Sequence, residues 1–303
     1  MAVSIPPAVR VRVGIPHFFR EDGTNQGYGS SRPKVRQQRC LALARCLQAL
    51  LAQGRAHDDL VLHIAGRCLQ AAPALERSGP PLFPLVVEVH VFTDGSHRLE
   101  EVLQLFDGQI QVHSLDLEDP RQLPLACRDH LVAAEPRADL SLYLEDDLVL
   151  SDPLFFDKQR WFLERSGGRA VLMPHRYELI PGGGGRRLLI DGPLKPEFIE
   201  RFCQPKVAVA SARFLDGQQV SFDRTANPHS GLFCVNSEQI LKLRQQPLPR
   251  QGFVTPLETA ATLTVLQQFA VLKPALAHRA FLWMEHGHPS FLGRLRTFPH
   301  CGP

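Results

Sequence analysis

Segments typical of β-strands alternate with segments typical of helices in the first half of the chain. Val9–Ile15 alternates and then becomes continuously apolar up to Pro16, and Leu85–Thr93 is rich in β-branched residues. Apolar residues recur at helical spacing in 41–51 and again in 99–106. Alternating strands and helices favour a parallel sheet with helices on both faces. The sequence therefore predicts an α/β, Rossmann-like fold with a mostly parallel sheet.

Further segments continue this alternation. We predict strands at 110–115 and 140–144, and a helix at 123–134. A glycine- and serine-rich loop is expected at 20–34, and a helix followed by a proline-rich linker at 54–84.

The second half of the chain has a different pattern. Short apolar segments at 177–180 and 187–190 can pair across the glycine run 182–185, and segments 212–215 and 220–222 flank a tight turn. Strands joined by short turns are antiparallel. We therefore expect a mixed or antiparallel C-terminal half.

Composition excludes several classes of protein. The 303 residues are 44% apolar and 21% charged, as in ordinary globular proteins, and the net charge of +3 is too small and dispersed for a nucleic-acid-binding stripe. Residues 1–13 do not resemble a signal peptide, and we see no run of the about 20 apolar residues that a spanning helix needs. We expect a cytoplasmic protein with no nucleic-acid partner and no integral membrane segment.

Three acidic residues, Glu145, Asp146 and Asp147, directly follow the predicted strand 140–144. Ligands of α/β sheets bind at the carboxyl ends of strands, where Pro16 and Asp94 are also expected. On an extended segment Glu145 and Asp147 would point to the same side. Two carboxylates in one pocket are commonly neutralised by Mn²⁺ or Mg²⁺ together with substrate phosphates. The alternative is a solvated loop that precedes a helix.

The context of this triplet resembles a known family. The string YLEDDLVLSDPLFF is similar to the DXD region of GT-A fold glycosyltransferases, and particularly to the EDD motif of inverting N-acetylglucosaminyltransferases of the Golgi. Upstream, VGIPHFFR resembles the opening strand of that fold, as in family 2, and FTDGS resembles its second-strand signature. The resemblance covers residues 9 to about 165, with insertions at 20–35 and 54–84.

The resemblance implies a metal-dependent hexosyl- or N-acetylhexosaminyltransferase with a nucleotide-diphosphosugar donor, a UDP- or GDP-sugar, and a glycan, lipid or small-molecule acceptor. The transfer is expected to be inverting. One GT-A domain, 1–303, would contain a nucleotide-binding half, 9–150, and an acceptor-binding half, 151–303. The resemblance places Pro16, Asp94, Glu145 and Asp146 against the donor and Asp147 on the metal. For Asp94 the alternative is an ordinary turn residue before Gly95.

The remaining candidates lie in the second half. Glu258, in a predicted helix at 257–269, is our candidate general base, and the alternative is a capping box with Thr255. His286 or His288 would supply a further metal ligand, as GT-A enzymes commonly use a histidine near the C-terminus, unless both are structural. His175 and His229 are candidate acceptor contacts.

Other functions remain open at this point. A non-catalytic sugar-nucleotide or protein-binding module could keep the same fold. A nucleotidyltransferase shares the acidic metal site but usually has a glycine-rich loop after its first strand, and Pro16-His17-Phe18-Phe19 is not such a loop. A metal phosphohydrolase usually has more dispersed ligands.

Overall fold

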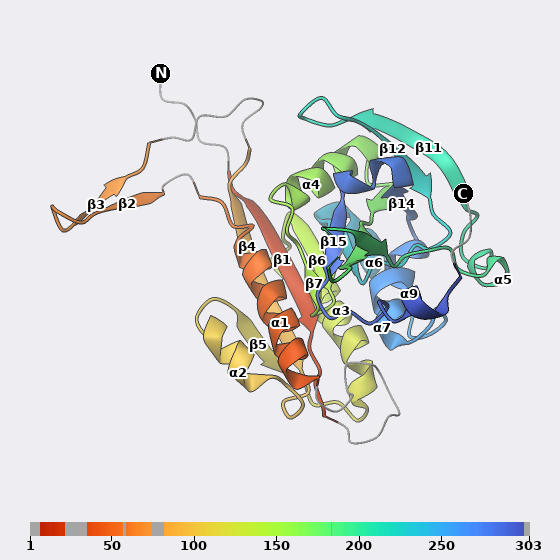
Figure 1. Ribbon diagram of the computed structural model, residues 1–303, viewed down its shortest axis with the longest axis horizontal. Helices are drawn as coiled ribbons and strands as arrows, with labels where there is room; N and C mark the ends of the chain where they lie inside the picture. Colours follow the sequence, from red (N-terminus) through yellow and green to blue (C-terminus); the bar gives the residue numbers. More distant parts are fainter. Residues whose placement is uncertain (1–6, 22–34, 57–58, 74–81, 183, 300–303) are drawn as a thin grey trace.

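The computed structural model describes residues 7–21, 35–56, 59–73, 82–182 and 184–299 (Figure 1). Its strands are β1 (Val9–Pro16), β2 (Leu60–His63), β3 (Cys68–Ala71), β4 (Leu85–Thr93), β5 (Gln111–Ser114), β6 (Leu140–Leu144), β7 (Leu148–Val149), β8 (Ala170–Leu172), β9 (His175–Leu179), β10 (Arg187–Leu189), β11 (Lys206–Arg213), β12 (Gln219–Arg224), β13 (Leu232–Asn236), β14 (Ala270–Pro274) and β15 (Trp283–His286). Its helices are α1 (Arg36–Leu51), α2 (Glu100–Leu103), α3 (Leu123–Ala133), α4 (Phe155–Ser166), α5 (Pro196–Ile199), α6 (Ser237–Arg244), α7 (Pro256–Glu258), α8 (Thr264–Leu266) and α9 (Arg294–Thr297), with a π-helical turn, Thr259–Leu263, between α7 and α8.

The central sheet has the strand order β13-β6-β1-β4-β5. Strands β6, β1, β4 and β5 are parallel, and β13 joins β6 in the antiparallel direction. The chain passes from β1 to β4 and β5 on one side and then returns to β6 on the other side of β1. The strand order therefore reverses between β1 and β6. In open α/β sheets, ligands bind at such a reversal, outside the carboxyl ends of the strands.

Helices cover both faces of this sheet, as predicted. Side chains of α1 and α2, among them Leu43 and Val102, share one apolar core with Val11 and Val13 of β1. The opposite face packs on α3, where a Cβ on Gly14 would lie 3.3 Å from Cys127 Sγ. Cover on both faces explains why β6 is buried along its whole length, whereas β1 keeps Arg10 and Arg12 at least partly exposed near its start.

The second half forms two smaller mixed sheets, which confirms the expected change of pattern. One has the order β10-β9-β15-β7 and the other β11-β12-β14-β8. The pairs β9–β10 and β11–β12 are antiparallel hairpins, as predicted. The predicted helix at 257–269 is present as α7, the π-helical turn and α8 in succession.

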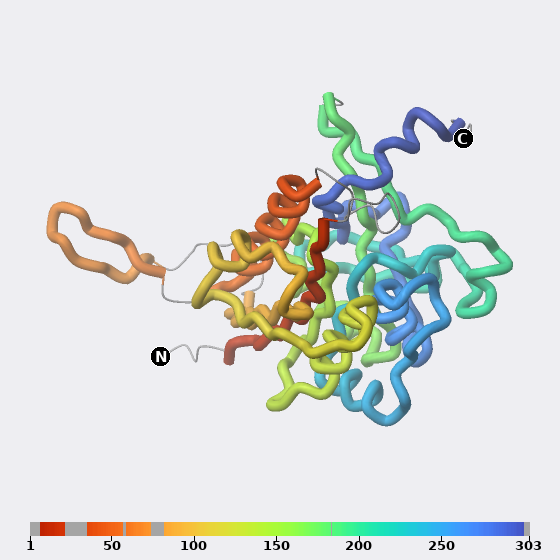
Figure 2. Tube along the Cα trace, turned by 90° about the horizontal axis from the view of Figure 1, so that it is seen from below, coloured from red at the N-terminus to blue at the C-terminus, as the bar shows by residue number. Residues whose placement is uncertain are grey.

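The prediction for 54–84 was wrong over the part that the structure describes. Instead of a helix, β2 and β3 form an antiparallel hairpin, which projects from the rest of the chain (Figure 1 and Figure 2). Leu60, Leu62, Ile64 and Leu69 are all exposed there. The partly apolar segment 60–75 predicts a helix, but short apolar segments fit strands equally well. The expected loop at 20–34 and the linker prolines lie largely outside the described residues.

Within the described ranges, the structure contains no helix that is long and apolar enough to cross a membrane.

Candidate functional site

The carboxyl ends of β1 and β6 are joined by a buried hydrogen-bond chain. The Leu99 amide donates to Nε2 of His17, which follows β1, at 3.0 Å. The ring proton therefore lies on Nδ1, which donates to Asp146 Oδ2 at 2.6 Å. His17 is completely buried. This chain fixes Asp146 at the point where the strand order reverses.

The acidic triplet forms a turn and is not extended, which differs from our expectation. Leu148 N donates to Glu145 O at 3.3 Å, because the chain reverses here to begin β7. Consequently it is Asp146 and Asp147 that share one partner, the buried Arg39 of α1. Arg39 Nη2 donates to both oxygens of Asp146 at 2.6 and 2.8 Å, and Nη1 donates to Asp147 Oδ2 at 2.9 Å. We call Asp146, Asp147, Arg39 and His17 the acidic turn.

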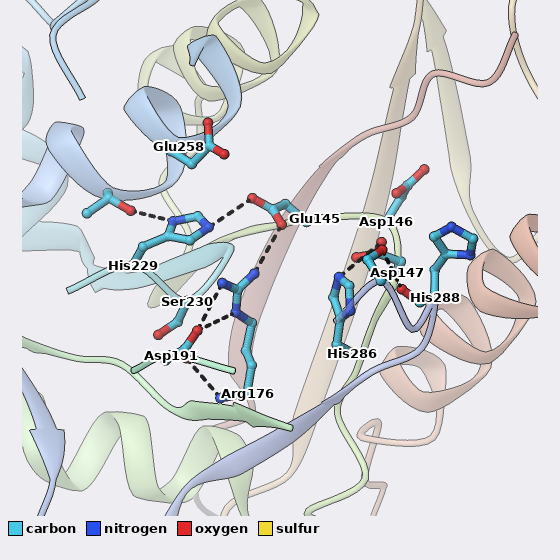
Figure 3. Close-up of polar contacts among 12 residues, drawn as sticks. Glu145, Asp146, Asp147, Arg176, Asp191, His229, Ser230, Glu258, His286 and His288 are labelled. Atoms are coloured by element: carbon cyan, nitrogen blue, oxygen red, sulfur yellow. Dashed lines mark hydrogen bonds and ion pairs between the residues drawn. The ribbon is translucent and has the colours of Figure 1, made fainter. Parts of the chain in front are cut away.

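Asp147 also faces His286. Strand β7 pairs with β15, and the Gly287 amide donates to Asp147 O at 2.7 Å. A Cβ on Gly287 would lie only 3.0 Å from that oxygen, so a residue without a side chain allows this close approach. His286 Nε2 lies 3.5 Å from Asp147 Oδ2 (Figure 3).

Glu178 orients the His286 ring from behind. It is completely buried on β9 and accepts hydrogen bonds from His286 Nδ1 at 2.9 Å and from the Ser290 and Phe291 amides. With its proton on Nδ1, a neutral ring presents the Nε2 lone pair towards Asp147. A carboxylate behind a histidine is the usual support for a metal-binding imidazole.

The spacing of Asp147 Oδ2 and His286 Nε2 is compatible with two ligands of one divalent cation. Two ligands at right angles on an ion are about 3 Å apart when each is about 2.1 Å from it, slightly closer than Asp147 Oδ2 and His286 Nε2. His288 lies close by, and its buried Nδ1 has no hydrogen-bond partner in the described part of the chain. No group of three or more His, Cys, Asp or Glu among the described residues is arranged to hold a metal. Further ligands would have to come from a substrate, as Mg²⁺ and Mn²⁺ commonly require.

Glu145 lies on the other side of the turn, towards the second half (Figure 3). Its Oε2 is 3.7 Å from Arg176 Nη1 and its Oε1 is 3.7 Å from His229 Nε2. Burial raises the pKa of Glu145 to about 8, although Arg176 opposes this shift. Oε1 is buried and has no hydrogen-bond partner among the described residues. A buried acceptor without a partner is costly, so this oxygen is suited to a ligand hydroxyl.

Behind Glu145 lies a buried ionic group that we call the Asp191 network. Asp191 accepts hydrogen bonds from Arg176 Nε at 3.0 Å, from the Arg176 amide at 2.9 Å and from Lys273 Nζ at 3.0 Å. Burial opposes its ionisation, but Arg176 and Lys273 outweigh burial and hold the pKa of Asp191 below its ordinary value. Lys273 also donates to His229 O at 2.7 Å, while burial lowers its pKa to about 8. The network thus holds Arg176 and the His229 loop against Glu145.

Gly231 is required for this packing. It has a φ of +68°, and a Cβ there would lie 2.6 Å from Glu145 Oε2 and 2.8 Å from Leu148 Cδ1. Replacing Gly231 by alanine should cost about 1–2 kcal/mol in backbone strain and about 1–3 kcal/mol in overpacking. Urea unfolding measures this loss.

Gly167→Ala is the matched control for this substitution. Gly167 has a φ of +59°, and no described atom lies within 4 Å of its Cβ position. The control should show the backbone cost alone. Equal losses in the two variants would contradict the steric role of Gly231.

The other predicted site residues are already engaged by neighbouring groups. Pro16 is buried at the end of β1. Both oxygens of Asp94 are used within its own turn, Oδ1 by the Ser96 and His97 amides and Oδ2 by His97 Nδ1 at 2.6 Å. His175 Nε2 donates to Pro274 O at 2.7 Å, and burial lowers the pKa of its ring.

Glu258 forms the capping box with Thr255 that we considered as the alternative. The Thr255 amide donates to Glu258 Oε2 at 3.0 Å, and the Thr255 hydroxyl contacts the same oxygen. The carboxylate nevertheless lies near Glu145 and His229 (Figure 3). His229 Nδ1 bonds to Thr262 Oγ1 at 2.8 Å, and burial lowers the pKa of His229 well below its ordinary value.

Five residues of the site could not be identified from the sequence as such: His17, Arg39, Glu178, Asp191 and Lys273. Arg39 and Lys273 occur in segments that otherwise predict an amphipathic helix and a buried strand. One sequence signal could have indicated such residues, namely a charged residue at a position that the apolar pattern assigns to the core. Charged residues are rarely buried unless they are paired, so a charge at such a position indicates a buried partner.

Comparisons with known proteins add little to this geometry. No protein-family model matches the chain, and no curated protein matches it. Among solved structures, it is similar to S. aureus TarS 1-349 at 11% identity and a TM-score of 0.38, covering 88% of this chain and 60% of that one. It therefore spans less than two thirds of the TarS chain. It is also similar to CMP:2-keto-3-deoxy-manno-octonic acid synthetase complexed with CTP, at 14% identity and a TM-score of 0.33, covering 92% and 90%. At these values neither likeness assigns a family or an activity to the chain.

Proposed function

We propose that this chain is a metal-dependent glycosyltransferase of the GT-A type. It would transfer a hexosyl or N-acetylhexosaminyl group from a UDP- or GDP-sugar to a hydroxyl of a glycan, lipid or small molecule. The observation that carries the proposal is the pair formed by Asp147 Oδ2 and His286 Nε2, 3.5 Å apart beside the reversal of the strand order. The EDD motif supplies one member of the pair and the C-terminal region supplies the other, as in the family that the motif resembles.

Each side of the turn has a different role in this proposal. Asp147 and His286 would hold Mn²⁺ or Mg²⁺, which when bound stabilises the negative charge of a diphosphate leaving group. Glu145, with its unpartnered Oε1, would accept a hydroxyl of the donor sugar. Asp146 is fully used by Arg39 and His17, so we assign it to holding the turn in place of the donor contact that the resemblance implied.

The acceptor hydroxyl needs a base to take its proton. We keep Glu258 as the candidate, because its carboxylate lies near Glu145 and because Thr255 engages only Oε2. The remaining oxygen, Oε1, would receive the proton. A single displacement assisted by this base inverts the anomeric centre. Of the two predicted acceptor contacts, His229 lies beside Glu145, whereas Nε2 of His175 is occupied by Pro274 O.

The proposal is tested by thermal unfolding with a panel of UDP-, GDP-, CMP- and dTDP-sugars, each with and without Mn²⁺ or Mg²⁺. A ligand at a hundredfold excess over its Kd stabilises the folded state by about 2.7 kcal/mol. We expect a rise in Tm with one nucleotide class, and only when the metal is present.

The other outcomes of this panel distinguish the alternatives. A shift with nucleoside triphosphates but with none of the sugar nucleotides would favour a nucleotidyltransferase. A metal-independent shift, without release of nucleoside diphosphate on incubation, would favour a non-catalytic sugar-nucleotide-binding module. No shift with any compound would contradict the proposed donor.

A further inference from the structure

Arg39 places a permanent positive charge directly beside the proposed metal ligand. Its guanidinium is buried, with a side chain 4% exposed, and arginine remains charged at every relevant pH. Nη1 donates to Asp147 Oδ2, the same oxygen that faces His286. Any cation bound to Asp147 would therefore lie a few ångströms from a second cation.

Arg39 cannot easily move away from this position. Its Nη2 is held by both oxygens of Asp146, and Asp146 is held in turn by His17. The side chain leaves α1 from a buried position, so withdrawal would leave the charge unpaired in the protein interior. The guanidinium is therefore a fixed part of the site.

The charges of the acidic turn sum to a single negative charge. Asp146 and Asp147 contribute two carboxylates and Arg39 offsets one of them. His17 contributes no charge, because its Nε2 accepts the Leu99 hydrogen bond and so carries no proton. The affinity of a site for a divalent cation depends strongly on the number of charged ligands. Arg39 therefore halves the net negative charge that the acidic turn offers to a free divalent cation.

We propose that Arg39 makes metal binding depend on the diphosphate of the donor. The guanidinium disfavours a free divalent cation, whereas a diphosphate brings negative charge that both the metal and Arg39 attract. The metal and the nucleotide would then bind as a coupled pair, and each would tighten the binding of the other by the same factor. This inference rests on the proposed function, and it assigns Arg39 as the positioning residue that couples the two ligands.

The experiment measures Mn²⁺ binding by electron paramagnetic resonance, with Mn²⁺ alone and then with UDP or GDP, allowing for Mn²⁺ held by free nucleotide. In the wild type we expect the nucleotide to tighten Mn²⁺ binding by about tenfold or more. In Arg39→Gln we expect Mn²⁺ alone to bind about tenfold or more tightly than in the wild type, because a nearby repulsive charge is removed. The effect of the nucleotide should shrink in that variant.

Arg39→Lys is the matched control, since it keeps the charge but lacks the fork that bridges the two carboxylates. Its affinity for Mn²⁺ alone should not exceed that of the wild type. General damage to the site would weaken binding in both variants, so only the loss of charge explains a gain confined to Arg39→Gln.

Several results would overturn the inference. One such result is that Arg39→Gln folds but binds Mn²⁺, in the absence of nucleotide, no more tightly than the wild type does. If that variant does not fold, the wild type decides, because equal Mn²⁺ affinities with and without nucleotide exclude the coupling. These results leave the proposed function standing. No binding of Mn²⁺ to the wild type under any condition would instead overturn the proposed metal site and this inference with it.

Discussion

Replacing Asp191 by asparagine is expected to lower the free energy of unfolding by about 3–5 kcal/mol, because it leaves two buried cations without their counter-charge. Arg176 Nε and Lys273 Nζ both donate to the Asp191 carboxylate at 3.0 Å, and the carboxylate side chain is 1% exposed. Asparagine keeps the volume but supplies no charge and turns an N–H group towards one of the cations. Urea unfolding followed by circular dichroism at pH 7 measures the loss.

Two comparisons separate this effect from a general sensitivity to substitution. Asp107→Asn changes an exposed aspartate whose side chain, within the described part of the chain, accepts a hydrogen bond only from the Gly108 amide. It should leave stability within about 0.5 kcal/mol of the wild type. Adding Lys273→Met to Asp191→Asn removes one of the stranded cations, so the double variant should lose less than the sum of the two single losses. Additive losses would show that the two residues do not interact.

Asp147→Asn should decrease metal-dependent turnover of the donor by about 10³-fold, since a metal ligand contributes several kcal/mol to transition-state stabilisation and each 1.4 kcal/mol is tenfold in rate. The substitution keeps the size of the side chain and an oxygen that can accept from Arg39 Nη1. The fold should therefore be retained. The measurement is release of nucleoside diphosphate from the donor identified by the nucleotide-sugar panel, with water as the acceptor, over a range of Mn²⁺ concentrations.

Asp139→Asn is the matched control for this prediction. Asp139 precedes the opposite end of β6, is exposed and accepts a hydrogen bond from the Arg10 amide at 2.8 Å. Its replacement should leave turnover and metal dependence unchanged. An Asp147→Asn protein that Mn²⁺ still stimulates fully would remove Asp147 from the proposed metal site.

The fold could be predicted from the sequence where a regular pattern of apolar residues ends at a clear turn or helix-breaking residue. Leu85–Thr93 is a strand that ends at a turn, and the structure places β4 there with the same bounds. The segment at 60–71 failed because its exposed apolar residues satisfy strand and helix spacing equally, and no neighbouring element buries them. The periodicity of apolar residues predicts secondary structure only where one face of the element is buried. The prediction therefore fails for an apolar segment that is exposed to solvent.

The candidate site could be predicted only in part from the sequence, and for a different reason. Asp147 could be singled out because three acidic residues after an apolar strand are unusual, and His286 because histidines alternate near the end of the chain. Their 3.5 Å separation depends on the pairing of β7 with β15, which no local pattern reveals. Arg39 and Asp191 are single charged residues in ordinary surroundings, and only the tertiary structure shows that each meets opposite charges in the core.

The placement of β13 affects how the chain can be made. β6 lies between β1 and β13 and is buried along its whole length, yet β13 belongs to the second half of the sequence. During synthesis on a ribosome, the edge of β6 that pairs with β13 therefore lacks this partner until residues 232–236 have emerged. The unpaired N–H and C=O groups of a strand edge are a template for pairing with other chains. The nascent protein thus passes through a stage in which β1, β4, β5 and β6 can pair while one edge of β6 is unprotected, and completion of the second half closes that edge.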